Sequence, residues 1–406
     1  VSHNRCQRRY LTSQRRFYET SGQYLKTDGV QITAKDWLLD PNNVEINTNS
    51  TANTAGDSVV KAGDISTALG NGTSVTIATG SGTGSTSSAT GVAIAGSGGT
   101  QADGNILVNS AITSTYNGSS APTLTLTANN GITVGAGIGI TGAGTGFNVL
   151  MTAKGLGTTS QGIILNSAIN AGTGTVSLTG TTSNASSNGI AFNNGSGITA
   201  SAYTATGNMN ATSGGSEGGA NGAGIMFRGT TSFTSTGASS ITGSTQSGTA
   251  DGVEFYSDAG TTFNAGAGSL VVSSGSNNIG IQGIRFGYAG GATMNTSGNV
   301  TIGSTGNNYA KLQIQGTINA SSGTLSLMGQ SNTGDGVYFQ DGGGVAPQVL
   351  ATNAANISVT GVSTNANTGN GIELNLNGVL SKITTNTGSI TMNGTASGTG
   401  NGSGIT

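Results

Sequence analysis

Short apolar segments recur along the chain, separated by Gly, Asn, Ser and Thr. The clearest recurring element is a glycine, an apolar residue, any residue and a large apolar residue. It occurs as GIIL at 162, GIAF at 189, GIMF at 224, GVEF at 252, GIRF at 283, GVYF at 336 and GIEL at 371. A shortened copy, GIT, lies at 404, and KLQIQ at 311–315 is a degenerate copy when it is aligned by Leu312. The copies are therefore spaced by about 25–35 residues.

Two further apolar points follow each copy. After Phe227 come Phe233 and then Ile241, and after Phe255 come Phe263 and then the LVV at 270. Alternating residues lie on opposite faces of a strand, so each repeat predicts about three short strands joined by corners. A single coil cannot bury its apolar face, but stacked coils about 4.8 Å apart can. The pattern predicts an all-β fold, a parallel β-helix (β-solenoid), over residues 61–406.

Before residue 160 the alternation is less regular, with segments that begin at 74, 91, 105, 123, 131 and 147. We expect no stretch of useful length with helical periodicity. Disorder is the main structural alternative, because hydrophobic residues make up only 33% of the chain. It is disfavoured because a random low-complexity chain does not keep three phased apolar points. An antiparallel sandwich does not explain a repeat of coil length.

The first residues differ from the rest, and the chain divides into three segments. Residues 1–17 hold five arginines, together with His3 and Cys6, the only histidine and the only cysteine. This segment is either a basic arm for an anionic partner or a segment foreign to the fold. Residues 18–60 form a junction segment, and residues 61–406 contain the repeats.

Composition excludes several kinds of chemistry. One cysteine and one histidine exclude a disulfide framework, a cysteine zinc site and a multi-histidine metal site. A net charge of −2 gives no footprint for nucleic acid beyond the first residues, and no apolar run approaches the roughly 18 residues of a membrane span. We therefore predict no catalytic residue, no cofactor, no metal, no nucleic-acid partner and no membrane span.

The densest carboxylate cluster in the repeats is Asp251, Glu254 and Asp258. It gives the second hypothesis, a carbohydrate-active β-helix enzyme (polysaccharide lyase or hydrolase) that uses these three residues. The favoured interpretation makes Asp251 a corner residue, because DG or NG precedes the same strand at 103–104, 188–189, 251–252, 335–336 and 370–371.

The middle residue of the recurring element should point outward. Glu254 and Arg285 would then form an exposed ion pair on adjacent coils, which stabilises little. The outward residues are Met226, Glu254, Arg285, Tyr338 and Glu373.

The segment AKDWLLDPNNVEI at 34–46 contains the only tryptophan, Trp37, close to Asp36, Asp40 and Glu45. The spacing of the three acids gives no acid–base partner. We expect WLL to form a strand or cap packed on the early coils, a turn at Pro41, and then a strand at VEI.

The segment YETSGQYLKTDGVQITAKDWLLDPNNVEI at 18–46 resembles the filamentous haemagglutinin family of large secreted bacterial proteins. The similarity continues into VVKAGDISTALGNGTSVTIATG at 59–80, GNILVNSAIT at 104–113 and LTLTANNGITV at 124–134. The resemblance implies a right-handed β-helix that is exported by two-partner secretion through an outer-membrane transporter. It also implies roles in adhesion, biofilm or contact with other cells.

The leading hypothesis is thus a non-enzymatic adhesive rod, secreted or at the cell surface of a bacterium, and an internal fragment of a larger exoprotein. Its partners would be the transporter during export and glycans or proteins of host or bacterial surfaces. The inserts at 204–223 and 340–347 are candidates for projecting loops. A passive spacer stalk is a third possibility that the sequence does not separate from the first.

Overall fold

The computed structural model describes residues 17–21, 25–53, 57–80, 104–156, 160, 162–212, 222–275, 282–288, 291–306, 309–342, 346–365, 368–375, 381–397 and 401–406. The chain forms two compact units. Unit 1 comprises Val1–Ser183 with Gly195–Ser201, and unit 2 comprises Asn184–Asn194 with Ala202–Thr406. The prediction for residues 1–17 falls almost wholly outside the described residues, as does the strand predicted at 91.

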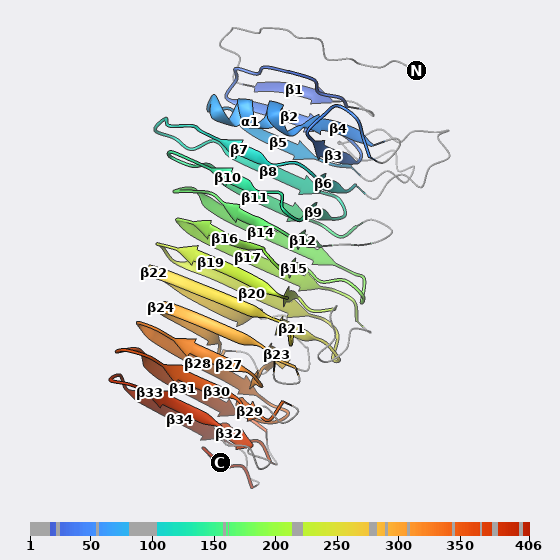
Figure 1. Cartoon of the computed structure of the whole chain (residues 1–406). Coiled ribbons are helices and arrows are strands. Elements are labelled where there is room, and N and C mark those ends of the chain that lie inside the picture. Colours follow the sequence, from blue (N-terminus) through green and yellow to red (C-terminus); the bar gives the residue numbers. More distant parts are fainter. Residues whose placement is uncertain are drawn as a thin grey trace. The chain divides into compact units, whose positions relative to one another are not determined.

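Unit 1 stacks its strands into a narrow sheet with one strand per coil and a wide sheet with two rows of strands (Figure 1). The narrow sheet contains β3 (Val44–Asn47), β4 (Ser58–Lys61), β6 (Ile106–Val108), β9 (Ile132–Val134) and β12 (Ile163–Leu165). One row of the wide sheet contains β1 (Phe17–Ser21), β2 (Asp36–Asp40), β5 (Ser74–Ala78), β8 (Thr123–Ala128), β11 (Asn148–Ala153) and β14 (Thr175–Thr182). The other row contains β7 (Ile112–Ser114), β10 (Ile140–Gly142), β13 (Ala168–Asn170) and β16 (Gly197–Ala200).

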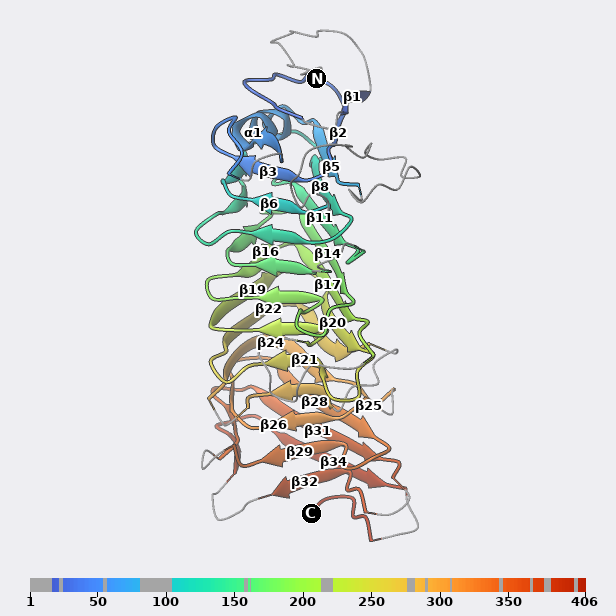
Figure 2. The same cartoon turned by 90° about the vertical axis from the view of Figure 1, so that its right-hand side faces the viewer.

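Unit 2 repeats the same two sheets, and Figure 2 shows its narrow-sheet strands β21, β26, β29 and β32 one above the next. The narrow sheet contains β15 (Ile190–Phe192), β18 (Ile225–Phe227), β21 (Asp251–Phe255), β23 (Gln282–Phe286), β26 (Leu312–Ile314), β29 (Val337–Gln340) and β32 (Ile372–Asn375). The wide sheet contains β17 (Ala202–Met209), β19 (Thr230–Ser235), β20 (Ser239–Thr245), β22 (Gly260–Ser274), β24 (Thr293–Gly303), β25 (Tyr309–Ala310), β27 (Thr317–Ala320), β28 (Thr324–Ser331), β30 (Gln348–Ala351), β31 (Asn356–Ser363), β33 (Lys382–Thr385) and β34 (Ile390–Ala396).

The strand register confirms the parallel β-helix and its three strands per coil. The recurring element pairs with itself from coil to coil, since Ile225 lies opposite Val253 and Val253 lies opposite Ile284. Leu312 lies opposite Ile284 and Val337, which confirms KLQIQ as a degenerate copy. In two coils the two wide-sheet strands are continuous, so that β22 and β24 are each one long strand. The pairing of β22 with β24 has a register shift between Asn264 and Ser269. The right-handed sense of the coils stays a prediction.

Phenylalanines form the centre of the core of unit 2. Along the narrow sheet the rings of Phe192, Phe227, Phe255 and Phe286 follow one another at centroid distances of 5.2, 4.4 and 5.4 Å. Phe233 and Phe263, from the wide sheet, meet this column mostly edge to face. All six rings are fully buried, and such stacks add to the free energy gained from burial of the rings. The large apolar residue of the recurring element therefore holds successive coils together.

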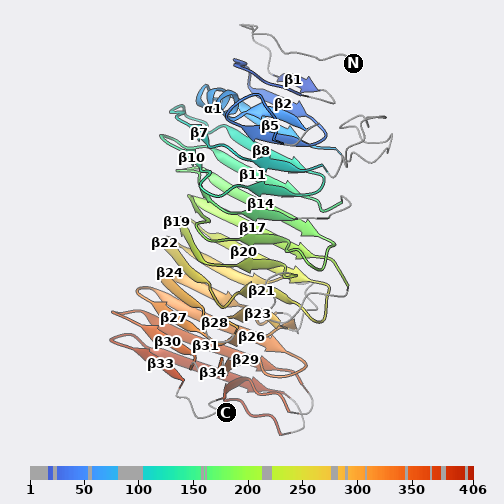
Figure 3. The same cartoon turned by 45° about the vertical axis from the view of Figure 1, so that its right-hand side comes forward.

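Helix α1 (Ala62–Gly70) contradicts the expectation that no helix is present. It packs beside β5 and β7 in unit 1 (Figure 3). Ile65, Ala68 and Leu69 are buried at the i, i+3 and i+4 spacing of a helix face, and Gly72 continues the chain at φ +81°. Its nine residues are too few to give a clear helical period in the sequence.

Asparagines at the coil corners join neighbouring coils. The Asn356 Oδ1 atom accepts hydrogen bonds from the backbone N–H and the hydroxyl of Ser389 at 2.9 Å each. Asn148 accepts the same pair of bonds from Thr175, both at 3.0 Å. The Asn side chain thus accepts a hydrogen bond from a backbone N–H at the corner. This role explains the asparagines at these corners.

Glycines mark the places where the narrow and wide sheets come closest in unit 2. A Cβ atom on Gly243, Gly329 or Gly361 would lie within the van der Waals radius of the backbone carbonyl of Gly252, Gly336 or Gly371, respectively. The glycine of the recurring element is needed there for close approach of two backbones. Gly104 differs because it has φ +71°, as the turn interpretation of the DG pair at 103–104 requires.

Candidate functional site

The structure does not hold Asp251, Glu254 and Asp258 together as a catalytic cluster. Asp251 and Glu254 belong to β21, and each residue is only 1% exposed. Asp258 lies beyond the other end of that strand, and its side chain is 51% exposed. At about 3.3 Å per strand residue, Asp251 lies roughly 13 Å from the end of β21, so Asp258 cannot join it in an acid–base pair.

Asp251 is a strand residue held by an ion pair, so its interpretation as a corner residue is wrong. Arg285 Nε donates to Asp251 Oδ2 at 2.9 Å, and the two side chains are 1% and 0% exposed. A carboxylate enclosed in this way is shielded from solvent. Its role is to neutralise Arg285 inside the coil stack.

Glu254 and Arg285 were predicted to be an exposed pair on adjacent coils. The predicted register is correct, but the predicted exposure is wrong. The two residues are Cα partners on β21 and β23, as the stacked repeats require. Both are 1% exposed, and Met226 in the same row on β18 is fully buried. Tyr338 and Glu373, further along this row, are half-buried. Sequence alternation correctly identified the face of the sheet, but it carries no information on what lies over that face.

Among the described residues of unit 2, three cations lie close to tyrosine rings, and the sequence pattern did not predict these contacts. The guanidinium of Arg228 lies 4.7 Å from the centre of the Tyr256 ring, and that of Arg285 lies 5.9 Å from the Tyr288 ring. Lys311 Nζ lies 4.9 Å from the Tyr338 ring. Aligned copies of the repeat would have revealed the first contact, because Arg228 and Tyr256 each follow the last residue of the recurring element.

In unit 1 the segment around Trp37 folds as expected. It forms β2, a turn at residues 41–43 and β3. Trp37 is 1% exposed, and its indole Nε1–H donates to Thr20 Oγ1 of β1 at 3.1 Å. Glu45 is fully buried, and its Oε2 atom accepts hydrogen bonds from the Asn47 side chain at 2.9 Å and the Asn53 N–H at 2.6 Å. The tryptophan and this glutamate are packing and loop-binding residues.

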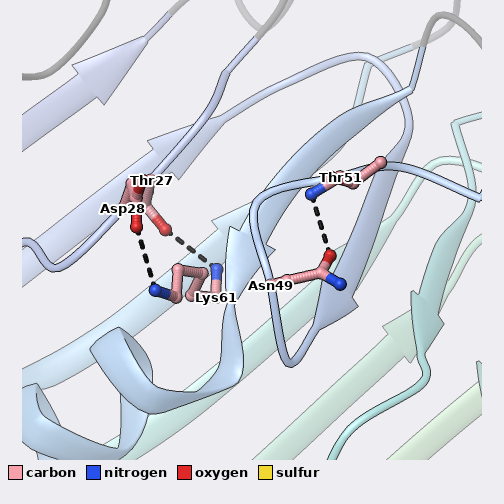
Figure 4. Close-up of polar contacts among 5 residues, drawn as sticks. All are labelled: Thr27, Asp28, Asn49, Thr51 and Lys61. Carbon is pink, nitrogen blue, oxygen red and sulfur yellow. Dashed lines mark hydrogen bonds and ion pairs between the residues drawn. The ribbon is translucent and has the colours of Figure 1, made fainter.

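A small polar cluster joins the segment between β1 and β2 to the end of β4, just before α1 (Figure 4). Lys61 Nζ forms an ion pair with Asp28 at 2.9 Å, and the Lys61 N–H donates to Thr27 Oγ1 at 2.9 Å. The hydrogen bond with Asp28 raises the pKa of Lys61. Burial raises the pKa of Asp64 in the first turn of α1, against the effect of hydrogen bonds from Thr27, Val30 and Gly29. In the neighbouring loop the Thr51 N–H donates to Asn49 Oδ1 at 3.0 Å (Figure 4).

Asp40 has the clearest electrostatic perturbation of the described carboxyls in unit 1. Burial, and secondarily the negative charge of Glu19 on β1, raise the pKa of Asp40 from 3.8 to about 6. Asp40 is 8% exposed and is the Cα partner of Ser21 on β1. Desolvation disfavours the charged carboxylate, so Asp40 lowers the free energy of unfolding when it is ionised.

Asp40→Asn should therefore change how the stability of unit 1 depends on pH. Because the folded-state pKa lies above the unfolded-state value, the folded state holds the proton more tightly, and wild-type stability falls as pH rises from about 4 to about 7. The free energy of unfolding of Asp40→Asn should rise relative to wild type over this range by about 2–3 kcal/mol. Urea titrations at each pH measure the difference, with Asp36→Asn on the same strand as the control. Parallel stability curves for wild type and Asp40→Asn would contradict the assignment.

The structure also bears on the other predicted features. Residues 202–209 form β17, so the first part of the 204–223 insert is a strand, whereas 213–221 and 343–345 lie outside the described residues. In the described ranges, no three His, Cys, Asp or Glu side chains are grouped to bind a metal ion. The described part of the chain holds no helix with the length and hydropathy needed to cross a bilayer.

Comparison with known proteins adds no assignment for this chain. A scan against protein-family models finds no match. A search of the curated proteins likewise finds no match.

Proposed function

We propose that this chain is a non-enzymatic adhesive β-helix, part of a bacterial exoprotein that is exported through an outer-membrane transporter to the cell surface or medium. The β-helix would space and display surfaces that contact other cells, host tissue or a biofilm matrix. The resemblance of residues 18–46 to filamentous haemagglutinins supports the export route and the surface location.

One observation carries the choice of adhesion over catalysis. Of the three acidic residues that an enzyme would use, Asp251 and Glu254 are buried in the stack and Asp258 lies apart from them. A polysaccharide-cleaving site needs an acid and a base that reach the same bond. Asp251 already binds Arg285 at 2.9 Å, and this buried contact argues against a catalytic role for its carboxylate.

The wide sheet suits repeated weak contacts. Its outward side chains are mostly small and uncharged, and neighbouring coils place hydroxyls in line, such as Ser326 with Ser358 and Thr391. An uncharged hydroxyl surface makes hydrogen bonds that are individually weak. Many copies along the stack, or several molecules on one cell, would make the contact strong by multivalency.

Two assays on the purified chain test this proposal. Microspheres coated with the chain should adhere to bacterial or epithelial cells several-fold more than albumin-coated microspheres. Incubation with neutral and acidic polysaccharides should release neither reducing ends nor unsaturated uronate products. Turnover that is lost in Asp251→Asn or Glu254→Gln would show an enzyme and overturn the proposal. Absence of both adhesion and turnover would also overturn it and favour a passive spacer.

A further inference from the structure

The turn after β2 contains the only Asp–Pro peptide bond of the sequence, between Asp40 and Pro41. Asp40 is the last residue of β2, and both residues are buried. An aspartate carboxyl can act as a nucleophile, and it reaches its own backbone carbonyl carbon through a small ring, so the attack is intramolecular. The bond to proline is a tertiary amide, and its nitrogen leaves as a basic secondary amine. An Asp–Pro bond therefore combines a nucleophile with a good leaving group.

The carboxyl group of Asp40 differs from other buried carboxyls of the chain in how it is held. Its Oδ1 atom is buried and has no hydrogen-bond partner among the described residues. By contrast, Arg285 binds the carboxylate of Asp251, and Asn47 donates to that of Glu45. An oxygen that accepts no hydrogen bond can turn toward the carbonyl carbon without the loss of one. The Oδ1 atom of Asp40 is thus available for attack on its own backbone.

The surroundings of Asp40 keep its carboxyl group protonated in mild acid. Burial, and secondarily the charge of Glu19, raise the pKa of Asp40 to about 6. The titratable residues of β1 are Tyr18 and Glu19, and β5, on the other side of β2, has none. Cleavage consumes the carboxyl proton, because the departing proline nitrogen takes it up. In an unfolded chain an aspartate holds this proton only below about pH 4, whereas Asp40 holds it up to about pH 6.

The chain is anchored on both sides of this bond. Before it, β2 pairs with β1 and β5. After it, the Gly80 N–H donates to Pro41 O at 3.4 Å, and the Asn105 N–H donates to Asn43 Oδ1 at 2.8 Å. A cut between Asp40 and Pro41 leaves all these contacts in place. The coils therefore stay folded after the cut, and only the covalent link is lost.

We propose that the Asp40–Pro41 bond cleaves itself in mild acid. A carboxyl oxygen of Asp40 bonds to the backbone carbonyl carbon of the same residue, the bond from that carbon to the Pro41 nitrogen breaks, and the carboxyl proton passes to this nitrogen. The products are a cyclic anhydride at Asp40 and a chain that begins at Pro41. One water molecule then opens the anhydride to two carboxyl groups. The reaction disconnects the residues up to Asp40 from β3 and the coils that follow, whether or not the chain is adhesive.

Incubation of the full chain between about pH 3 and about pH 8, with protease inhibitors present, tests this proposal. Mass spectrometry of the denatured sample should find the fragments 1–40 and 41–406, and N-terminal sequencing of the second should begin at Pro41. The cleavage rate should be half-maximal near pH 6 for the folded chain and near pH 4 for the chain in urea. Glu19→Gln should move the midpoint of the folded chain to lower pH, because it removes a neighbouring negative charge.

Two variants test the reacting groups. Asp40→Asn removes the attacking carboxyl and Pro41→Ala removes the leaving group, so each should lower the cleavage rate in mild acid about tenfold or more. Asp36→Asn on the same strand is the matched control and should be cleaved like wild type. The proposal is overturned if no fragment begins at Pro41, if the folded and urea-treated chains share one midpoint, or if either variant, shown to be folded by circular dichroism, is cleaved like wild type. The two wild-type midpoints decide the question even where a variant does not fold.

Discussion

Replacing Gly361 by valine is expected to destabilise unit 2 by about 3–5 kcal/mol, among the largest effects that a single substitution produces. Gly361 lies in β31, and a Cβ atom there would overlap the carbonyl of Gly371 and come within 2.8 Å of Ile372 Cγ1. The obstacle is mostly backbone, so the side chain cannot be accommodated by a rotamer change. Hydrogen exchange should show lost protection in β31 and in β34, whose Gly394 is the register partner of Gly361.

Gly248→Val is the matched control for this prediction. Gly248 belongs to the same unit, and a Cβ atom there would meet nothing within 4 Å. Its substitution should change the free energy of unfolding by no more than about 0.5 kcal/mol. Equal stability of Gly361→Val and wild type would show that the wide and narrow sheets do not approach as described.

Arg285→Met is expected to cost about 3–5 kcal/mol, because it leaves the carboxylate of Asp251 buried without its cation. Glu254, the register partner of Arg285 on β21, is a second buried acidic residue on the neighbouring strand. Chemical denaturation of the full chain measures the loss. The double variant Asp251→Leu/Arg285→Met should recover most of it, because a buried ion pair replaced on both sides by apolar groups is often neutral.

Arg228→Met serves as the control for the buried pair. Its partner Asp258 is half-exposed, and the two charged groups are 3.6 Å apart, so the loss should stay below about 1 kcal/mol. If Arg285→Met costs no more than Arg228→Met, Arg285 and Asp251 do not hold the coils together. The interpretation of Asp251 as structural would then fail, and the enzymatic hypothesis would regain its leading residue.

The fold was predictable because the spacing of the sequence repeat matches the pairing of strands from coil to coil. Ile225, Val253, Ile284, Leu312 and Val337 align in sequence by the recurring element, and the same residues pair in the narrow sheet. Helix α1 was missed because nine residues give too short a window for the helical period. Sequence alternation also cannot predict that Met226, Glu254 and Arg285 are buried on the outward face, since their burial depends on what lies over it.

The candidate site was less predictable than the fold. Acidic residues close in sequence, such as Asp251 and Asp258, are separated by the length of a strand. Residues far apart in sequence, such as Arg228 and Tyr256, become neighbours because each follows the same strand position on adjacent coils. In a β-helix the chemistry is therefore read across aligned repeats and not along the chain.

Cysteine pairing across two coils tests the stacking register most directly. Ser358 of β31 and Thr391 of β34 are Cα partners, so in a Cys6→Ser background their cysteine variants should lie about 4.8 Å apart, within the range of a disulfide. Ser358 and Asn393 lie on the same face but one alternate position apart, about 8 Å by the spacing of strands and residues. The account predicts that mild oxidation, followed by mass spectrometry, gives a disulfide in the first pair and not in the second. Equal or preferential cross-linking of Ser358→Cys with Asn393→Cys would contradict the parallel, in-register stack.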